Sequence, residues 1–136
     1  MKQLQVVPPQ SVYQLWETVR PYFEASVDAS SGDCTAEQLK TILANGQQTL
    51  FVVVEDEKII GSFSISINNH PNNRVALITA FGGNGITNIE VFEQIVTWAK
   101  AQGATKIKAI AKEAQARLYR QKVGLNTTMY VVETLI

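Results

Sequence analysis

The sequence is poor in several features that mark particular classes of protein. It has one cysteine, Cys34, one histidine, His70, and equal numbers of basic and acidic residues, 12 of each. A single cysteine excludes an internal disulfide and is typical of a reducing compartment, so we expect a cytoplasmic location. A single histidine excludes a His pair, so no metal site is expected. The zero net charge argues against nucleic-acid binding by the whole chain.

Long apolar runs are also missing. The longest uninterrupted aliphatic or aromatic run extends from Leu50 to Val54, far short of the roughly 20 residues that a membrane-spanning helix needs. We therefore expect no membrane partner. What the chain does have is an ordinary globular composition, with 46% hydrophobic and 18% charged residues among 136. That length predicts a single domain over residues 1–136.

Hydrophobic periodicity and capping residues predict the order of the elements. Apolar residues three and four positions apart indicate helices, whereas β-branched or alternating runs indicate strands. The expected strands are 4–7, 49–54, 59–67, 75–81, 105–111 and 127–135, and the expected helices begin after Ser11, Thr35 and Thr87 and cover 112–122. The order is therefore β, α, α, β, β, β, α, β, α, β, which predicts an α/β chain of the α+β kind.

Two local patterns make narrower predictions. Ser62, Ser64 and Ser66 alternate with apolar residues, which predicts one buried and one wetter face for that strand. Thr35 is followed three residues later by Gln38, and Thr87 by Glu90, which predicts capping boxes at the starts of the second and third helices.

The stretch from Gly82 to Gly85 (GGNG) joins an expected strand to an expected helix. Unpaired N–H groups at the start of a helix, together with the positive end of its dipole, favour an anion. The turn therefore predicts a cradle for a phosphate group. The alternative is a tight turn in which close backbone packing leaves no room for a Cβ, and the sequence leaves both interpretations open.

Several short motifs in this order resemble the GCN5-related N-acetyltransferase (GNAT) superfamily. They are Lys58-Ile59-Ile60-Gly61, Gly82 to Gly85, Trp98-Ala99-Lys100 with Gly103, and Leu118-Tyr119 with Gly124. Others are similar to the small GNAT-like proteins encoded by tailed phages, namely Cys34-Thr35, Gly46 with Leu50-Phe51-Val52-Val53, Pro71, and Phe81-Gly82-Gly83. The resemblance implies a mixed, mostly antiparallel central sheet of about six strands, with helices on both faces and a splay between the fourth and fifth strands.

The resemblance also implies a cofactor and a site. Acetyl-CoA lies in the splayed gap of this family, and the positions that would meet its pyrophosphate and pantetheine arm are Ala80, Phe81, Gly82, Gly83, Asn84 and Gly85. A tyrosine on the last helix often protonates the departing thiolate, and Tyr119 is the matching residue. The alternative for Tyr119 is a packed ring with a solvated hydroxyl. Ala80 stands where the family usually has Gln or Arg.

Two functions from different classes follow from the resemblance. One is transfer of an acetyl group from acetyl-CoA to an unidentified amine of a small molecule or a protein, with an acceptor pocket built from residues 13–33. The other is a catalytically inactive phage protein that acts in a virion or during assembly, with phage structural proteins as partners in the host cytoplasm or the virion. A homo-oligomer is compatible with either function. Basic residues cluster between Lys100 and Lys122 near the end of the sequence. This cluster suggests a third hypothesis, binding of a polyanion.

Overall fold

The computed structural model describes residues 1–28, 33–83 and 87–136, and it confirms the expected order of elements as far as the last helix. The elements are β1 (Gln3–Val7), the short 3-10 helix η1 (Pro9–Ser11), α1 (Val12–Asp28), α2 (Ala36–Ala44), β2 (Thr49–Glu55), β3 (Lys58–Asn69), β4 (Arg74–Gly83), α3 (Ile89–Ala101), β5 (Lys106–Ala109) and α4 (Glu113–Val123). Asn84 and Gly85 of the glycine turn lie outside the described residues. Within the part of the chain that is described, no helix has both the length and the apolarity that crossing a membrane requires.

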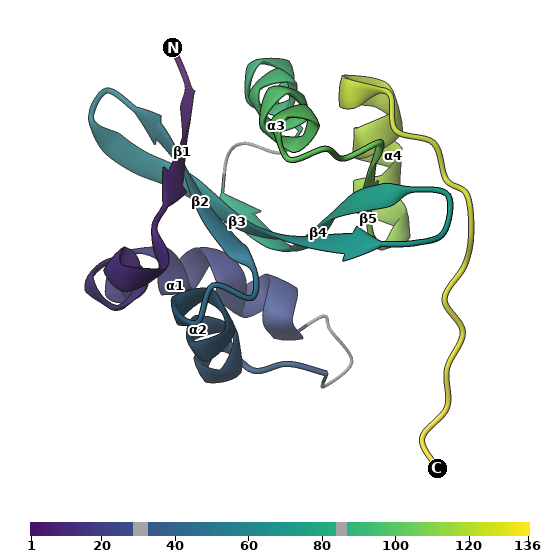
Figure 1. Cartoon of the computed structure of the whole chain (residues 1–136), viewed down its shortest axis with the longest axis horizontal. Helices are drawn as coiled ribbons and strands as arrows, with labels where there is room; N and C mark the ends of the chain where they lie inside the picture. The colour runs from purple at the N-terminus through teal and green to yellow at the C-terminus, as the bar shows by residue number, and fades with distance from the viewer. Residues whose placement is uncertain (29–32, 84–86) are drawn as a thin grey trace.

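The five strands form one mixed sheet in the order β1-β2-β3-β4-β5 (Figure 1). The first three neighbouring pairs are antiparallel, and β4 and β5 are parallel. The parallel pair arises because α3 carries the chain back across the sheet between β4 and β5, as a crossover connection must. The expected mixed, mostly antiparallel sheet is therefore confirmed.

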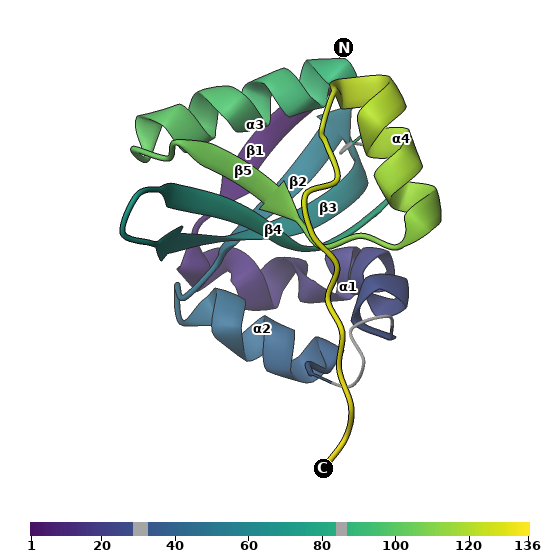
Figure 2. The ribbon, with the colours of Figure 1, turned by 90° about the vertical axis from the view of Figure 1, so that its right-hand side faces the viewer.

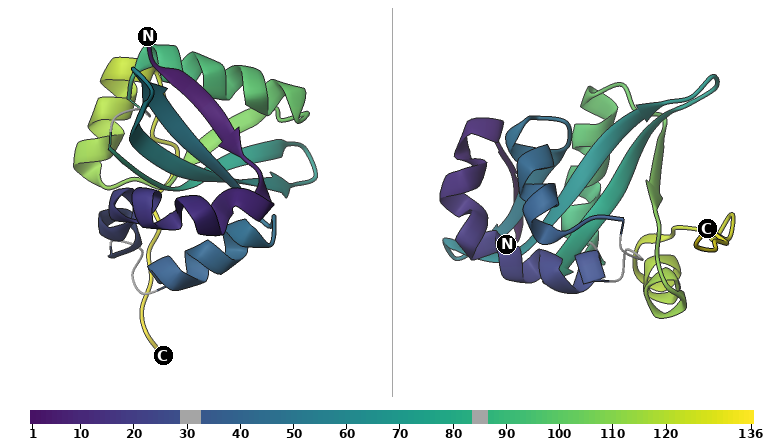
Figure 3. Two further views of the ribbon diagram at one scale, coloured as in Figure 1. Left: turned by 90° about the vertical axis from the view of Figure 1, so that its left-hand side faces the viewer. Right: turned by 90° about the horizontal axis from the view of Figure 1, so that it is seen from below.

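Helices cover both faces of the sheet, as expected. Figures 2 and 3 show α1 and α2 on one face and α3 and α4 on the other. Successive side chains of β2 point to opposite faces of the sheet and so enter both cores. Leu50 and Val52 pack in the core under α1 and α2, while Phe51 and Val53 pack in the core under α3 and α4. A strand that is buried on both sides is apolar at successive positions, which explains the unbroken run in β2.

The serines of β3 do not form a wetter face, so that prediction was wrong. Ser62 and Ser64 are 1% and 0% exposed. Ser62 Oγ donates a hydrogen bond of 2.7 Å to the Phe51 carbonyl, and Ser64 Oγ lies 2.7 Å from Thr79 Oγ1. Helix α1 packs over this side of β3 and β4, so the small hydroxyls satisfy one another and the backbone instead of water.

The starts of two helices show how far local sequence determines a cap. At α2 the expected capping box is present, with Thr35 Oγ1 accepting from the Gln38 N–H and Gln38 Oε1 accepting from the Thr35 N–H. At α3 the expected box on Thr87 was wrong, because Asn88 is the N-cap and its Oδ1 accepts from the N–H groups of Glu90 and Val91. Asparagine is at least as good a cap as threonine, so the helix begins one residue later.

The expected sixth strand at 127–135 does not form, so the sheet has five strands rather than about six. This segment extends from α4 without a strand partner among the described residues, and Tyr130 and Val132 are 87% and 89% exposed. The β-branched and aromatic composition of the segment favours a strand. A strand also needs a neighbour to take its N–H and C=O groups, and no described part of the chain supplies one here.

Candidate functional site

The ladder between β4 and β5 covers only the first half of β4. It joins Val75–Ile78 to Lys106–Ala109, which is the whole of β5, and it ends because β5 ends. β4 continues along β3 to Gly83, while the chain after β5 turns into α4 through the N-cap residue Lys112. The outer edge of β4 from Thr79 onward therefore lacks a strand partner among the described residues.

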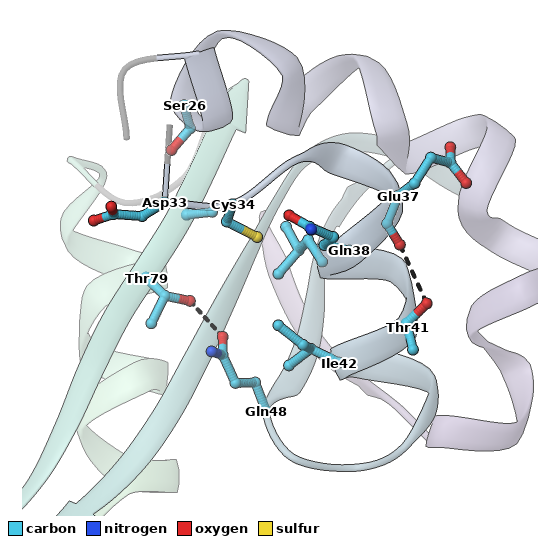
Figure 4. Close-up of a pocket in the computed structure, with 11 residues that line it drawn as sticks. Ser26, Asp33, Cys34, Glu37, Gln38, Thr41, Ile42, Gln48 and Thr79 are labelled. Atoms are coloured by element: carbon cyan, nitrogen blue, oxygen red, sulfur yellow. Dashed lines mark hydrogen bonds between the residues drawn. The ribbon is translucent and has the colours of Figure 1, made fainter. Parts of the chain in front are cut away.

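A β-bulge in the pairing of β4 with β3 lies where the ladder with β5 ends. Ile78 lies opposite Ile65 and Ala80 opposite Ser64, so Thr79 is the extra residue of β4. A bulge adds a residue to one strand and redirects its side chain. Thr79 is exposed, and its Oγ1 donates a hydrogen bond of 2.6 Å to Gln48 Oε1 (Figure 4).

The backbone of β4 beyond the bulge carries an outward donor. The Phe81 N–H donates to Ser26 Oγ of α1 at 3.3 Å, so it points away from β3. N–H groups alternate in direction along a strand, so the Gly83 N–H lies on the same edge. In this structure Ser26 thus holds the N–H group of Phe81, one of the positions that the resemblance assigns to the cofactor.

The two described glycines of the turn are explained by close packing of α1. A Cβ on Gly82 would overlap the Tyr22 carbonyl group. A Cβ on Gly83 would lie 2.7 Å from the Tyr22 ring, and Gly83 has a φ of +73°. The Tyr22 hydroxyl also donates to the Ile59 carbonyl at 3.0 Å. Backbone crowding therefore requires glycine at both positions, whatever else the turn does.

Two backbone N–H groups at the start of α3 already have a hydrogen-bond acceptor within the chain. Asn88 Oδ1 accepts from the N–H groups of Glu90 and Val91 at 3.0 and 3.3 Å. These are donors that an anion at a helix N-terminus would otherwise meet. A phosphate cradle on this helix would have to use other donors.

Tyr119 lies beside this edge of β4. Its ring centroid is 6.0 Å from that of Phe81, and the residue is only 4% exposed. The hydroxyl is buried and has no hydrogen-bond partner among the described residues. Burial raises the pKa of Tyr119 above its ordinary value, since the phenolate would lose its hydration. The alternative of a solvated hydroxyl was therefore wrong, and the role of Tyr119 as a proton donor remains a prediction.

A cavity of about 710 Å³ lies on the α1 and α2 side of the same strand (Figure 4). Its lining comes from the end of α1, from α2 with the residues just before it, and from the bulge of β4. The lining residues are Ser26, Asp33, Cys34, Glu37, Gln38, Leu39, Thr41, Ile42, Gln48, Thr79 and Ala80. Only Ser26 and Asp33 come from the stretch 13–33 in which the acceptor pocket was expected. Ser26 links the two parts of the site, because it lines the cavity and binds the Phe81 N–H.

The two carboxylates of the cavity differ in their surroundings. Glu37 is ion-paired with Arg20 and Lys40, each at 2.8 Å. The hydrogen bond from Lys40 is the main cause that lowers the pKa of Glu37. Asp33 makes no ion pair with any described residue, so its negative charge is available to a ligand.

Cys34 and His70 are the remaining reactive side chains that the sequence singled out, and neither is placed to act as a nucleophile or a base in the cavity. The Cys34 thiol donates to the Thr35 carbonyl at 3.3 Å, and burial raises its pKa, which disfavours the thiolate. His70 is exposed in the β3–β4 turn, where its backbone N–H donates to the Asn73 carbonyl. Among the described residues, no three His, Cys, Asp or Glu side chains form a group that could hold a metal ion.

The cavity shows what sequence reasoning missed. Gln48 and Thr79 are separated by 31 residues, and their hydrogen bond exists only because β2 and β4 flank β3. Neither residue belongs to a motif, so no pattern in the sequence distinguishes them from other polar residues at strand ends.

The architecture is that of the GNAT acetyltransferases, and solved structures of that class show the same fold. A predicted acetyltransferase with acetyl-CoA from Clostridium acetobutylicum matches with a TM-score of 0.64 and 16% identity, over 98% of this chain and 96% of that one. The aminoglycoside acetyltransferase meta-AAC0020 from an uncultured soil metagenomic sample, in complex with sisomicin, matches with a TM-score of 0.70 and 12% identity, over 99% and 97%. A ribosomal-protein-alanine N-acetyltransferase from Brucella melitensis matches with a TM-score of 0.66 and 8% identity, over 98% and 99%.

These identities are low, and the likeness therefore shows the fold alone. No protein-family model and no curated protein sequence matches the chain. The chain has the GNAT fold over nearly its whole length, and its activity is a separate question.

Proposed function

We propose that the protein is an acyltransferase that moves an acetyl group from acetyl-CoA to an amine. The observation that carries the proposal is the unpartnered edge of β4 after Ile78, with Tyr119 on one side and the cavity on the other. A thioester held along that edge would meet an acceptor entering through the cavity. The acetyltransferases with the same fold support this, because one of them was crystallised with acetyl-CoA.

The described residues fit the thiol end of acetyl-CoA. The bound cofactor supplies an activated acyl group, a thioester. The outward N–H groups of Phe81 and Gly83 are the main-chain donors that would hold its arm, together with Ala80, Gly82 and the turn residues Asn84 and Gly85. Tyr119 fits because a buried hydroxyl without a partner is costly unless a ligand supplies one. The N–H groups of Glu90 and Val91 are not part of this set, since Asn88 holds them.

The chain's own groups have separate tasks. The Tyr119 hydroxyl donates a proton at the leaving group, a role for which its raised pKa keeps it protonated at neutral pH. Asp33 attracts a cationic amine into the cavity and accepts a proton from it. Thr79 and Gln48 offer polar atoms that orient the acceptor. β4 carries no Asp or Glu, so the base comes from the cavity side.

Acetyl-CoA binding is the direct test. Thermal denaturation with acetyl-CoA between 10 µM and 1 mM should raise the midpoint, because a ligand that binds only the folded state stabilises it. Release of free CoA thiol with a panel of amines then identifies the acceptor. Aminoglycosides and N-terminal alanine peptides belong in that panel because proteins of the same fold are named for those acceptors. No shift at 1 mM would overturn the proposal.

The variant Ser26→Ala tests the role of the Phe81 N–H. Ser26 occupies this donor in the present structure, so a ligand that uses the donor must displace the hydroxyl. Removing a competing hydrogen bond is worth about 0.5–1.5 kcal/mol, and the affinity for acetyl-CoA should rise about 2- to 10-fold. Thr97→Ala, on the exposed side of α3, is the matched control and should leave the affinity unchanged. A weaker affinity in Ser26→Ala would show that the hydroxyl itself holds the ligand.

A second candidate is a GNAT-fold protein without chemistry that serves in a phage virion or in its assembly. It is favoured by the Ser26 hydroxyl on Phe81 and by the crowding of Tyr22 against Gly82 and Gly83. The Ser26 hydroxyl occupies a donor of the β4 edge, and Tyr22 fills the space that a side chain would take at Gly82 and Gly83. This candidate predicts no thermal shift with acetyl-CoA in either wild type or Ser26→Ala, and no thiol release with any amine.

A further inference from the structure

Two glutamines line the cavity, and in each the chain engages only the oxygen of the side-chain amide. Gln38 Oε1 accepts from the Thr35 N–H at 2.9 Å, and Gln48 Oε1 accepts from the Thr79 hydroxyl at 2.6 Å. A primary amide also carries two N–H donors on its nitrogen. The Nε2 atoms of Gln38 and Gln48 have no hydrogen-bond partner among the described residues, so these donors are left for water or a ligand.

The orientation of the Gln48 amide is fixed by two hydroxyl groups behind it. Ser64 is 0% exposed, and its Oγ lies 2.7 Å from Thr79 Oγ1, its only hydrogen-bond partner among the described residues. The Ser64 hydroxyl therefore donates to Thr79, because a buried donor without an acceptor is costly. The Thr79 proton is then directed to Gln48 (Figure 4), and their separation of 2.6 Å is typical of O–H···O rather than of N–H···O. Nε2 is consequently the half of the Gln48 amide that remains for a ligand.

The charges and donors that line the cavity are complementary to a particular kind of amine. Glu37 is held in two ion pairs, whereas Asp33 makes none with any described residue. A carboxylate without an ion pair attracts an ammonium group and repels another carboxylate. The two amide nitrogens only donate, so they match an oxygen that only accepts. A neutral carbonyl is such an oxygen, whereas a hydroxyl brings a proton that needs an acceptor of its own.

We propose that the acceptor of the acetyl group is an amine that also carries a neutral carbonyl group, and that Gln48 recognises the carbonyl oxygen through Nε2. This inference rests on the proposed function and adds the chemical class of its acceptor. A plain alkylamine would be attracted by Asp33, but it would displace water from the Gln48 amide without replacing the hydrogen bond. Gln48 is half-buried, so solvent makes good only part of that loss. The site should therefore discriminate against plain alkylamines, as sites built around a hydrogen bond do.

Kinetics with matched amines is the first test. Glycinamide and isobutylamine are close in size, but only glycinamide carries a carbonyl; ethanolamine and propylamine form the corresponding hydroxyl pair. Gln48→Glu keeps an oxygen for the Thr79 hydroxyl and replaces Nε2 by a second oxygen. The ratio of kcat/KM for glycinamide to that for isobutylamine should therefore fall about 10-fold in this variant. Comparing ratios between proteins cancels the different basicities of the amines.

Gln47→Glu is the matched control, because it adds the same charge one residue away, on an exposed side chain outside the cavity lining. It should leave the ratio unchanged. An unchanged ratio in Gln48→Glu, an equal fall in both variants, or a fall confined to the hydroxyl pair would overturn the inference. Triglycine amide carries the same carbonyl as glycinamide, and the better acceptor of the two shows whether a peptide terminus or a free amino amide is the source.

NMR of the isotope-labelled full chain separates a failure of this inference from a failure of the proposed function. The side-chain N–H signals of Gln48 are identified by their absence from the spectrum of Gln48→Glu, and titration with an amine in the presence of free CoA needs no turnover. Glycinamide should shift these signals, and isobutylamine at the same concentration should not. Such shifts without release of CoA from acetyl-CoA with any amine would overturn acetyl transfer and leave the recognition of the carbonyl standing. No shift with glycinamide, or equal shifts with both amines, would overturn the inference even if acetyl transfer is found.

Discussion

At the scale of single residues, Tyr119 gives the clearest prediction. Its hydroxyl is buried and lacks a hydrogen-bond partner among the described residues, which costs the native state about 1–3 kcal/mol. Tyr119→Phe should therefore raise the free energy of unfolding at pH 7 by about 1 kcal/mol, measured by urea denaturation. A loss of stability would show that the hydroxyl is bonded. If the proposed function holds, the same variant should lower kcat about 100-fold.

The pH dependence of this effect has a definite sign. Burial raises the pKa of Tyr119 in the native state, whereas a tyrosine in the unfolded chain has a pKa of about 10. Above that pH the unfolded state binds fewer protons than the native state, so stability falls as pH rises. The advantage of Tyr119→Phe over wild type should widen between pH 9 and 11. Tyr130→Phe, whose ring is 87% exposed, is the matched control.

Gly82 is the second residue with a sharp expectation. The Cβ of Gly82→Ala would overlap the Tyr22 carbonyl group, and α1 would have to move. Overpacking of this kind should cost about 3 kcal/mol or more. Gly124→Ala is a useful comparison, since Gly124 has a φ of +77° and open space around its Cβ position. The comparison variant should lose only about 1–2 kcal/mol, the cost of a left-handed conformation. Equal losses in urea denaturation would contradict the packing argument.

At the scale of elements, the β2–β3 hairpin stores backbone strain. Asp56 and Glu57 have φ values of 51° and 63°, the left-handed pair that a two-residue hairpin turn requires. Glycine adopts this conformation without the side-chain penalty. Glu57→Gly should therefore stabilise the protein by about 0.5 kcal/mol. Lys58→Gly, one residue into β3, should destabilise it, and thermal unfolding of the pair measures the difference.

At the scale of the whole molecule, two cores share one sheet. Trp16 belongs to the core under α1 and α2. Trp98 packs against the core under α3, with its ring 4.8 Å from that of Phe51. Since alternate residues of β2 enter both cores, neither core can unfold while β2 remains native. The fluorescence midpoints of Trp16→Phe and Trp98→Phe in urea should each coincide with the circular-dichroism midpoint of the same variant. Separate transitions would divide residues 1–136 into two units.

The sequence by itself determined the order of the elements through α4 and the capping box at Thr35. These features depend on residues within a few positions of one another, where propensity and capping decide the outcome. The resemblance to the GNAT superfamily added the mixed, mostly antiparallel sheet with helices on both faces, which the structure confirms, while the splay between β4 and β5 stays a prediction.

Only the tertiary structure decided the features on which function depends. It placed Ser26 on the Phe81 N–H, 55 residues away, and it buried the Tyr119 hydroxyl. It also put the Tyr22 backbone against Gly82 and left 127–135 without a strand partner among the described residues. The physical reason is the same in each case: burial, crowding and strand pairing are relations between distant segments. A local pattern sets what a segment favours, and its neighbours in space decide whether those preferences are met.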